Sequence, residues 1–375
     1  MHRSRHTVTW AWVVALVILL SRPACVRGQS RDVQGWRLAE PGYQFHFPAD
    51  HGPHLEFRTE WWYFTGNLTA SNGQAFGFEL TFFRHGYGNL RQTTIASSPF
   101  ATGDVKFVHF TVTDVQHKRF YAAEKTSRGA FGEAGFTENG KLVWVEDWNT
   151  VYDGHFRLQA NDTQHGIDLD LVPLGQPVLE GDRGFSRKAE GAGRASYYYS
   201  VPVLQAHGTV QVKGTRFQVS GTAWFDREWA TNQLDPTQAG WDWFAIQLGD
   251  GSSLMLYRMR RQDGESDPFS SGKYIAADGS TTDLGREDFQ MTPTRFWQRK
   301  ATAPQYPVGW TLSVPKLQTT LQVSTPVDDQ ELALSVHYWE GCIRVSGSKM
   351  GKPASGVGYM ELTGYENRLQ GMSPR

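Results

Sequence analysis

The chain has 375 residues, 39% of them hydrophobic, which is enough for two domains with substantial cores. Its formal net charge is −1 and no basic stripe occurs, which argues against nucleic acid or an anionic membrane as the partner. The partner is therefore expected to be a small apolar ligand or a neutral surface, and the oligomeric state is left open. Aromatic residues make up 13% of the chain and favour broad strands over helices.

The N-terminus predicts an export signal over residues 1–28. Basic residues precede an apolar run at 10–20, which is short for a bilayer span. Cleavage is expected before Gln29 and would give a periplasmic or secreted protein without a stable membrane span. An uncleaved anchor is the alternative. Lipidation at Cys25 is disfavoured because Arg22 stands where an aliphatic residue is wanted.

Cysteine and histidine usage predicts neither a disulfide nor a metal site. Of the 2 cysteines, Cys25 lies in the predicted signal, which leaves Cys342 alone in the mature chain. Of the 12 histidines, those outside the predicted signal form no HxxxH spacing, and no CxxC pair or phosphate-binding loop occurs. We therefore expect no metal and no cofactor.

The segment TEWWYFTGNL (59–68) places a carboxylate among indole rings. If it forms a strand, Glu60 and Trp62 share one face while Trp61 and Tyr63 share the other. Alternation alone does not say which face lines a pocket. Glu60 and Trp62 are predicted as the N-terminal contribution to a ligand site.

Short stretches of alternating apolar and polar residues recur along the chain and predict an all-β protein. Helix signals are scarce, and the 39 glycines include Asn-Gly and Asp-Gly pairs that mark tight turns. Regular strand–turn spacing of this kind is typical of antiparallel sandwiches and barrels. The alternating segments are 107–115, 155–161, 167–174, 207–214, 217–225 and 320–327.

Two domains of similar size are predicted, at 29–205 and 206–375. The boundary follows a Gly-rich segment at 180–200, which predicts a long functional loop that leads into a strand. The two halves share a pattern of an aromatic strand, an NG or DG turn and an apolar return strand that ends in Arg. This pattern occurs at 61–84 and 241–260 and predicts an internal duplication of one β-domain.

The segment SGTAWFDREWATNQL (220–234) places two carboxylates between tryptophans. As a strand, it puts Asp226 and Glu228 on one face and Arg227 and Trp229 on the other. A carboxylate that is desolvated against indole has a raised pKa and can act as a general acid. The alternative is a structural network in which an arginine neutralises one of the acids.

Aromatic and acidic residues recur in the C-terminal half. The segment HYWEGCIRVSG (337–347) combines both types, although a tryptophan that fills the core is the alternative reading of its WEG motif. The segments RGFSRK (183–188) and SYYYS (196–200) contain serines but no GxSxG motif, so a serine hydrolase is disfavoured. The candidate residues in this half are Trp241, Trp243, Tyr257, Tyr338 and Glu340.

Four ordered blocks, from about residue 40 to the C-terminus, resemble the AttH-like family of exported bacterial proteins: FRTEWWYFTGNL, GFSRK…ASYYYS, GTAWFDREW…Q…GWDWFAIQLGDG and DQE…YWEG…G…GVGYMELTGY. Members are often labelled predicted secreted hydrolases and are grouped with hydroxyneurosporene synthase, the carotenoid 1,2-hydratase. The resemblance implies two lipocalin-like β-domains packed together. Some fungal cyclases that assist Diels–Alder closure are similar in architecture. In the hydratase branch a His acts where Arg227 stands here, so Asp226 or Glu228 would replace it.

These features predict an exported protein that binds an apolar, isoprenoid-like molecule and hydrates or hydrolyses it by carboxylate acid–base chemistry. A non-catalytic lipid or pigment carrier is the alternative, and a carbohydrate-binding sandwich is a third option. Tryptophans would serve as cation-stabilising or stacking walls. The predicted catalytic residues are Asp226, Glu228 and Tyr257, and the predicted ligand-binding residues are Glu60, Trp62, Arg227, Trp229, Trp241, Trp243, Tyr338 and Glu340.

Overall fold

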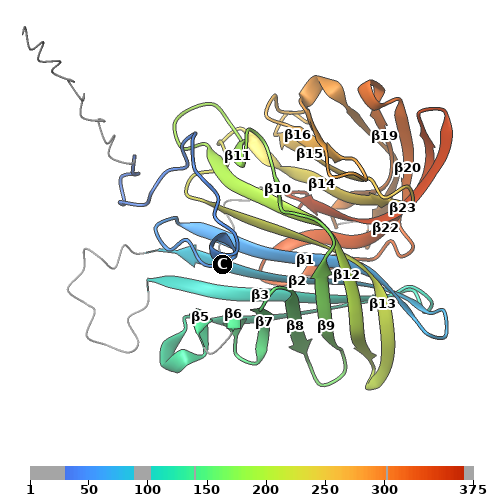
Figure 1. Ribbon diagram of the computed structural model, residues 1–375, viewed down its shortest axis with the longest axis horizontal. Helices are drawn as coiled ribbons and strands as arrows, with labels where there is room; N and C mark the ends of the chain where they lie inside the picture. Colours follow the sequence, from blue (N-terminus) through green and yellow to red (C-terminus); the bar gives the residue numbers. More distant parts are fainter. Residues whose placement is uncertain (1–29, 88–102, 139–140, 301–302, 367–375) are drawn as a thin grey trace, which may run out of the picture.

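The computed structural model describes residues 30–87, 103–138, 141–300 and 303–366. Within these ranges the chain is almost entirely β-strand, with four short 3₁₀ turns and no α-helix, so the all-β prediction is confirmed. Two curled antiparallel sheets form two barrel-like units (Figure 1). The 3₁₀ turns are η1 (Ala49–His51), η2 (Ala130–Gly132), η3 (Arg286–Asp288) and η4 (Pro315–Leu317).

The first sheet contains the strands up to residue 230. Their bounds are β1 (Thr59–Ala70), β2 (Ala75–Gly86), β3 (Asp104–Asp114), β4 (Arg119–Ser127), β5 (Ala134–Glu138), β6 (Lys141–Val145), β7 (Trp148–Tyr152), β8 (Phe156–Asn161), β9 (Gly166–Pro173), β10 (Val178–Leu179), β11 (Phe185–Arg187), β12 (Ala195–Val212) and β13 (Thr215–Ala230). The order in the sheet is β4-β3-β2-β1-β13-β12-β9-β8-β7-β6-β5, and both β10 and β11 pair with β12.

The second sheet contains the strands from residue 238 onwards. Their bounds are β14 (Gln238–Leu248), β15 (Ser253–Arg261), β16 (Ser271–Ile275), β17 (Thr281–Leu284), β18 (Gln290–Gln298), β19 (Gln305–Val314), β20 (Thr319–Ser324), β21 (Glu331–Ala333), β22 (His337–Lys349) and β23 (Lys352–Thr363). The order is β17-β16-β15-β14-β23-β22-β20-β19-β18, and β21 pairs with β22.

The chain passes from the first sheet to the second between Ala230 and Gln238. The boundary predicted from the sequence, near residue 205, lies inside β12. The strands β12 and β13 belong to the first unit because β13 pairs with β1 along its length, from Thr59 opposite Ala230 to Ala70 opposite Val219. Within the described residues the two units therefore extend from 30 to 230 and from 238 to 366.

The same local strand order occurs in both sheets. It runs β3-β2-β1-β13-β12 in the first and β16-β15-β14-β23-β22 in the second, so each predicted hairpin lies against the last long hairpin of its own unit. In this arrangement Tyr63 on β1 lies opposite Asp226 on β13, and Trp243 on β14 lies opposite Glu361 on β23. The predicted duplication thus extends to the register of strand pairing.

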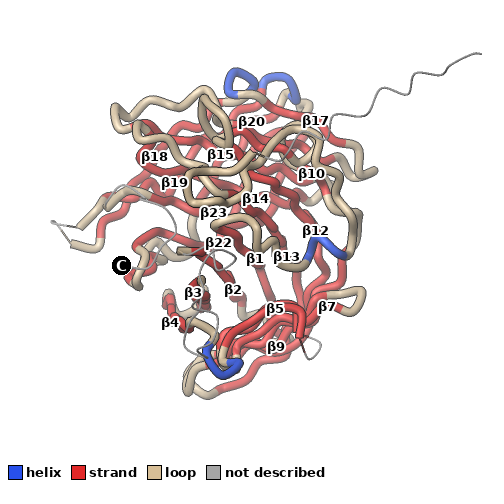
Figure 2. Tube along the Cα trace, turned by 90° about the vertical axis from the view of Figure 1, so that its left-hand side faces the viewer, coloured by secondary structure: helices blue, strands red, loops and turns tan. Residues whose placement is uncertain are grey.

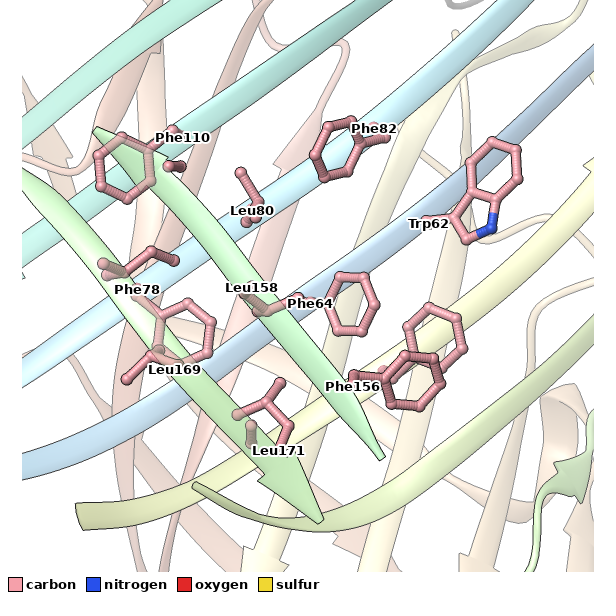
Figure 3. Packing of buried hydrophobic residues seen from close by; sticks show 14 of the residues in the cluster. Trp62, Phe64, Phe78, Leu80, Phe82, Phe110, Phe156, Leu158, Leu169 and Leu171 are labelled. Carbon is pink, nitrogen blue, oxygen red and sulfur yellow. The ribbon is translucent and has the colours of Figure 1, made fainter. Parts of the chain in front are cut away.

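Side chains alternate between two environments along the strands where the units meet. On β1, Trp62 and Phe64 point into the core of the first barrel (Figure 3), whereas Tyr63 belongs to a separate apolar cluster shared by both units. The central strands of the two units lie against each other, with β1 against β23 and β2 against β22 (Figure 2). Both faces of these strands are therefore buried, one in a barrel and one between the barrels.

The predicted export signal lies outside the described residues. Within the part of the chain that the structure describes, no helix has the length and apolar character needed to cross a bilayer. In the same part, no group of three or more His, Cys, Asp or Glu side chains is arranged to hold a metal ion.

Candidate active site

A pocket opens between the two units, where their outward strand faces meet. The space between its walls, with the open solvent at its mouth counted, totals about 660 Å³. Eight aromatic rings dominate the wall, and the polar residues among them are mainly acidic. The lining residues are Trp61, Tyr63, Phe83, Lys188, Tyr198, Asp226, Glu228, Gln233, Leu234, Trp241, Trp243, Tyr257, Met259, Tyr338 and Glu361. Such a wall suits an apolar ligand with one polar or reacting point.

Asp226 is a buried carboxyl group that titrates near neutral pH. Its Oδ1 accepts hydrogen bonds from Ser200 Oγ (2.6 Å) and Trp224 Nε1 (2.6 Å), and its Oδ2 accepts one from Tyr198 Oη (2.5 Å). Burial raises the pKa of Asp226 to about 7, although these three hydrogen bonds oppose the rise and the nearby Glu228 adds to it. Because Oδ2 has one partner and Oδ1 has two, Oδ2 is the oxygen with room for a proton.

Glu228 lies on the same face as Asp226 but is held in an ion pair. Its Oε1 lies 3.2 Å from Lys188 Nζ and accepts a hydrogen bond from Gln233 Nε2 (3.1 Å). Burial opposes the charge of Lys188, but Glu228 and Tyr257 raise the pKa of Lys188 overall. Protonation of Glu228 would leave a buried ammonium without its partner, which is costly. The geometry therefore favours Asp226 over Glu228 as a proton donor.

Two further buried acids belong to the second unit, Glu361 in the opposite wall of the pocket and Glu340 directly behind that wall. Burial raises the pKa of Glu361 to about 8, and the charges of Glu79 and Asp226 add to this rise. Glu340 accepts a hydrogen bond from Tyr63 Oη (2.5 Å), and its pKa is raised by burial and by Glu361. Several carboxyl groups therefore share a water-poor region, where neighbouring negative charges keep one another protonated.

The duplication places equivalent residues on the two walls of the pocket. Asp226 and Glu361 occupy matching positions on β13 and β23, each opposite an aromatic residue of the adjacent strand. Tyr198 on β12 and Tyr338 on β22 also match, because each pairs with the residue two positions after the acid of its own unit, Glu228 and Thr363. The pocket is therefore built from two copies of one outward face.

Six of the residues predicted from the sequence are brought together in this pocket: Asp226, Glu228, Tyr257, Trp241, Trp243 and Tyr338. Tyr257 Oη lies 3.3 Å from Ser186 Oγ, and the ammonium of Lys188 lies 4.4 Å from the centre of the Tyr257 ring. Trp243 Nε1 donates a hydrogen bond to Tyr198 Oη (3.2 Å). Within the described residues neither carboxylate on β13 pairs with an arginine: Arg227 reaches Glu228 only at its backbone carbonyl, and the Glu228 carboxylate is paired with Lys188 instead.

Five predicted ligand-binding residues do not line the pocket, and four of them belong to the first unit: Glu60, Trp62, Arg227 and Trp229. They lie on the opposite strand face, inside the first barrel, because side chains alternate along β1 and β13. There Glu60 accepts a hydrogen bond from Arg84 Nε (2.5 Å) and forms an ion pair with Arg227, whose guanidinium lies 3.7 Å from the centre of the Trp62 ring.

Trp229 stacks on the His54 ring at 3.6 Å within the same barrel. Arg227 holds the carboxylate of Glu60 rather than an acid of the pocket. Glu340 also stays out of the wall, although its bond to Tyr63 places it directly behind the wall.

Several residues of the site were not predicted from the sequence. Lys188 lies in the segment at 180–200 that was predicted to be functional, and its neighbour β12 supplies Tyr198 and Ser200. Trp61 and Tyr63 were assigned to a face of unknown role. A signal for Lys188 existed, since a lone lysine in a Gly-rich loop that leads into aromatic residues is unusual. No local pattern identifies Ser200 as a donor to Asp226.

The fold and the pocket together define an all-β protein of two duplicated, lipocalin-like barrel units with an acidic, aromatic pocket between them. The model of the AttH-like family matches residues 38–365, and the chain belongs to that family. The resemblance found in the sequence is thereby confirmed. The crystal structure of an AttH candidate from Nitrosomonas europaea is 36% identical, with a TM-score of 0.77, over 87% of this chain and 98% of that one.

Two further similar proteins carry names of water-adding or water-removing enzymes. Kievitone hydratase from Nectria haematococca shares the fold, with a TM-score of 0.66 and 17% identity over 86% of this chain and 93% of that one. The dehydratase asqC of Emericella nidulans is 19% identical over 217 residues, which are 55% of this chain and 60% of that protein. The chain thus spans about 60% of the length of the curated relative that it matches.

Proposed function

We propose that the chain adds water to an apolar, isoprenoid-like alkene, or removes water from the corresponding alcohol, in the pocket between its two units. The observation that carries this proposal is Asp226, a carboxyl group with a pKa of about 7 in a wall of indole and phenol rings. Such a group can donate a proton at neutral pH and can also take one back. The names of the hydratase and dehydratase relatives support the same direction.

In the proposed hydration, Asp226 Oδ2 gives its proton to one alkene carbon. A C–H bond forms as the π bond breaks, and positive charge develops on the neighbouring carbon. The indole faces of Trp61, Trp241 and Trp243 are the cation-stabilising groups of the wall. Each well-placed ring contributes up to about 2 kcal/mol when water is excluded.

The oxygen of a water molecule then attacks the cation and loses a proton to a base of the pocket. The ion pair of Glu228 and Lys188 provides fixed charges that orient this water without changing protonation state. Elimination of water follows the same steps in reverse, with Asp226 as the base that removes the proton from carbon.

We also propose that the protein acts outside the cytoplasm, because of the predicted signal at residues 1–28. A carrier without catalysis remains the alternative function, since the aromatic wall would bind an apolar ligand equally well.

The test uses a panel of acyclic isoprenoid alkenes and tertiary alcohols in ¹⁸O-water, with mass spectrometry of the products. We expect the alcohol product to contain one ¹⁸O atom from water. The rate of hydration should fall about 100-fold or more in Asp226→Asn. The matched control is Asp250→Asn, which changes an aspartate in the turn after β14, bonded to Lys349 and Ser252. Equal turnover by Asp226→Asn and the wild type would contradict the proposal. Ligand retention without conversion would indicate the carrier.

A further inference from the structure

Tyr338 connects the pocket to two further side chains that lead to the surface. Its Oη lies 2.6 Å from His109 Nδ1, and His109 Nε2 lies 2.9 Å from Glu124 Oε2. His109 is fully buried on β3, whereas the Glu124 side chain on β4 is 19% exposed and accepts a second hydrogen bond from Ser335. The three side chains therefore form a hydrogen-bonded line from the pocket wall of the second unit to the solvent-exposed edge of the first unit.

The two ends of this line determine where the imidazole carries its proton. A carboxylate only accepts hydrogen bonds, so His109 Nε2 bears the proton and Nδ1 accepts from the Tyr338 hydroxyl. Burial lowers the pKa of His109, although Glu124 opposes this, so the ring is neutral at rest. Burial disfavours the charge of Glu124, but its hydrogen bonds with His109 and Ser335 lower its pKa overall.

The surroundings of the imidazole keep water away from its sides. The rings of Phe83 and Phe107 lie 5.2 Å and 5.4 Å from the His109 ring. The titratable groups that act on this line are Glu124 and Tyr338 at its two ends. Behind Tyr338 stand Glu79, Glu340 and Glu361, which add to burial in raising the pKa of Tyr338. The hydroxyl of Tyr338 therefore stays protonated until a base takes its proton.

We propose that Tyr338, His109 and Glu124 form the base of the site and its proton exit, an inference that rests on the proposed function. When water adds to the cation, its proton passes to Tyr338 Oη as the proton of Tyr338 passes to His109 Nδ1. The C–O bond forms, one O–H bond of water breaks, and the imidazolium releases its Nε2 proton through Glu124 to solvent. The resting state returns when His109 Nε2 takes up a proton from solvent through Glu124 and the Nδ1 proton passes back through Tyr338 to the ionised Asp226, so that one water is consumed per turnover.

In this scheme Tyr338 is the residue that touches the reacting water, and His109 and Glu124 act through it. A hydroxyl, an imidazole and an orienting carboxylate in hydrogen-bonded order is a recurring arrangement for moving protons at a reacting centre. Glu228 is a poorer acceptor of the proton from water, because its protonation would leave the buried Lys188 without its partner.

The chain contains a matched control for this line. His51 Nδ1 lies 2.6 Å from Tyr199 Oη, and both residues are buried in the first barrel away from the pocket wall. The two tyrosine–imidazole distances are thus alike, although Tyr199 Oη also donates to the Asp50 carbonyl (3.3 Å), and of the two contacts that of His109 joins a pocket residue to a carboxylate.

The test is nuclear magnetic resonance of the full mature chain labelled with ¹⁵N-histidine, which requires no substrate. At pH 7 we expect a neutral His109 ring with its proton on Nε2. Tyr338→Phe should shift the His109 Nδ1 signal, whereas Tyr199→Phe should shift His51 and leave His109 unchanged. In Glu124→Gln, exchange of the Tyr338 hydroxyl proton with water, measured by saturation transfer, should slow about 10-fold because an amide does not take up a proton.

A cationic His109 ring at pH 7, a proton on Nδ1, or unchanged hydroxyl exchange in Glu124→Gln would each overturn the proposal. These readouts are independent of the proposed reaction. If these results are obtained but no alkene or alcohol is converted, the hydratase proposal is wrong, whereas proton transfer along Tyr338, His109 and Glu124 is still supported. If Asp226→Asn abolishes turnover and the readouts fail, the base lies elsewhere. With a substrate in hand, Tyr338→Phe should lower kcat about 100-fold at unchanged KM, and adding His109→Gln should lower it no further.

Discussion

Replacing Asp226 by Asn should remove a pH dependence from the stability of the protein. Burial raises the pKa of Asp226 from its ordinary value of 3.8 to about 7, so between these values the folded chain binds more protons than the unfolded chain. The stability that this carboxyl contributes is complete below about pH 4 and is lost as the pH rises through 7. From pH 5 to pH 8 the loss is about 3 kcal/mol. An amide does not titrate, so Asp226→Asn should lack this part of the decline.

The assay is denaturant unfolding of both proteins at several pH values from 5 to 8. The unfolding free energy of Asp226→Asn relative to the wild type should rise by about 3 kcal/mol across this range. Asp250→Asn is the control: burial opposes, but Lys349 and Ser252 lower the pKa of Asp250 to about 2, so its contribution is lost only at strongly acid pH. Parallel curves for Asp226→Asn and the wild type would refute the reasoning, because Asp226 would then be ionised throughout.

Two further predictions concern buried groups outside the proposed chemistry. Glu60→Gln leaves Arg84 and Arg227 without their shared carboxylate and should lower the unfolding free energy by about 3–5 kcal/mol in denaturant titrations. The exposed Glu265→Gln should change it by less than about 0.5 kcal/mol, and an equally small effect at Glu60 would show that the pair is dispensable. Burial raises the pKa of the Cys342 thiol to about 12, so iodoacetamide at pH 8 should label Cys342 only in denatured protein, as mapped by mass spectrometry. Rapid labelling of the native chain would show that this thiol reaches solvent.

The strands were predictable because their signal is local. The alternating segments 107–115, 155–161 and 167–174 coincide with β3, β8 and β9, since one face of each lies in the barrel core. The division between the units was not predictable in this way. Whether β12 and β13 belong to the first or second sheet depends on their pairing with β9 and β1, which are distant in sequence.

The sequence predicted which strands carry the candidate site but not which face of each strand lines the pocket. Alternation correctly separated Glu60 and Trp62 from Trp61 and Tyr63, but both faces of β1 are buried, and residue type alone does not distinguish a barrel interior from an inter-unit pocket. The acidic face of β13 had the same ambiguity, and there Asp226 lies on the pocket side. Packing between the units, which no single strand encodes, decides both cases.

The acid chemistry of this site arises from the packing of one unit on the other. The three donors to Asp226 all come from the first unit and favour its ionised form, so they cannot account for its raised pKa. The second unit supplies much of the covering wall, including Trp243, whose indole nitrogen bonds the tyrosine that holds Asp226. An isolated first barrel would expose Asp226 to water and would lose the desolvation that protonates it. Residues of these outward faces can therefore change without disturbing either barrel core, and one pair of duplicated barrels can then support different reactions.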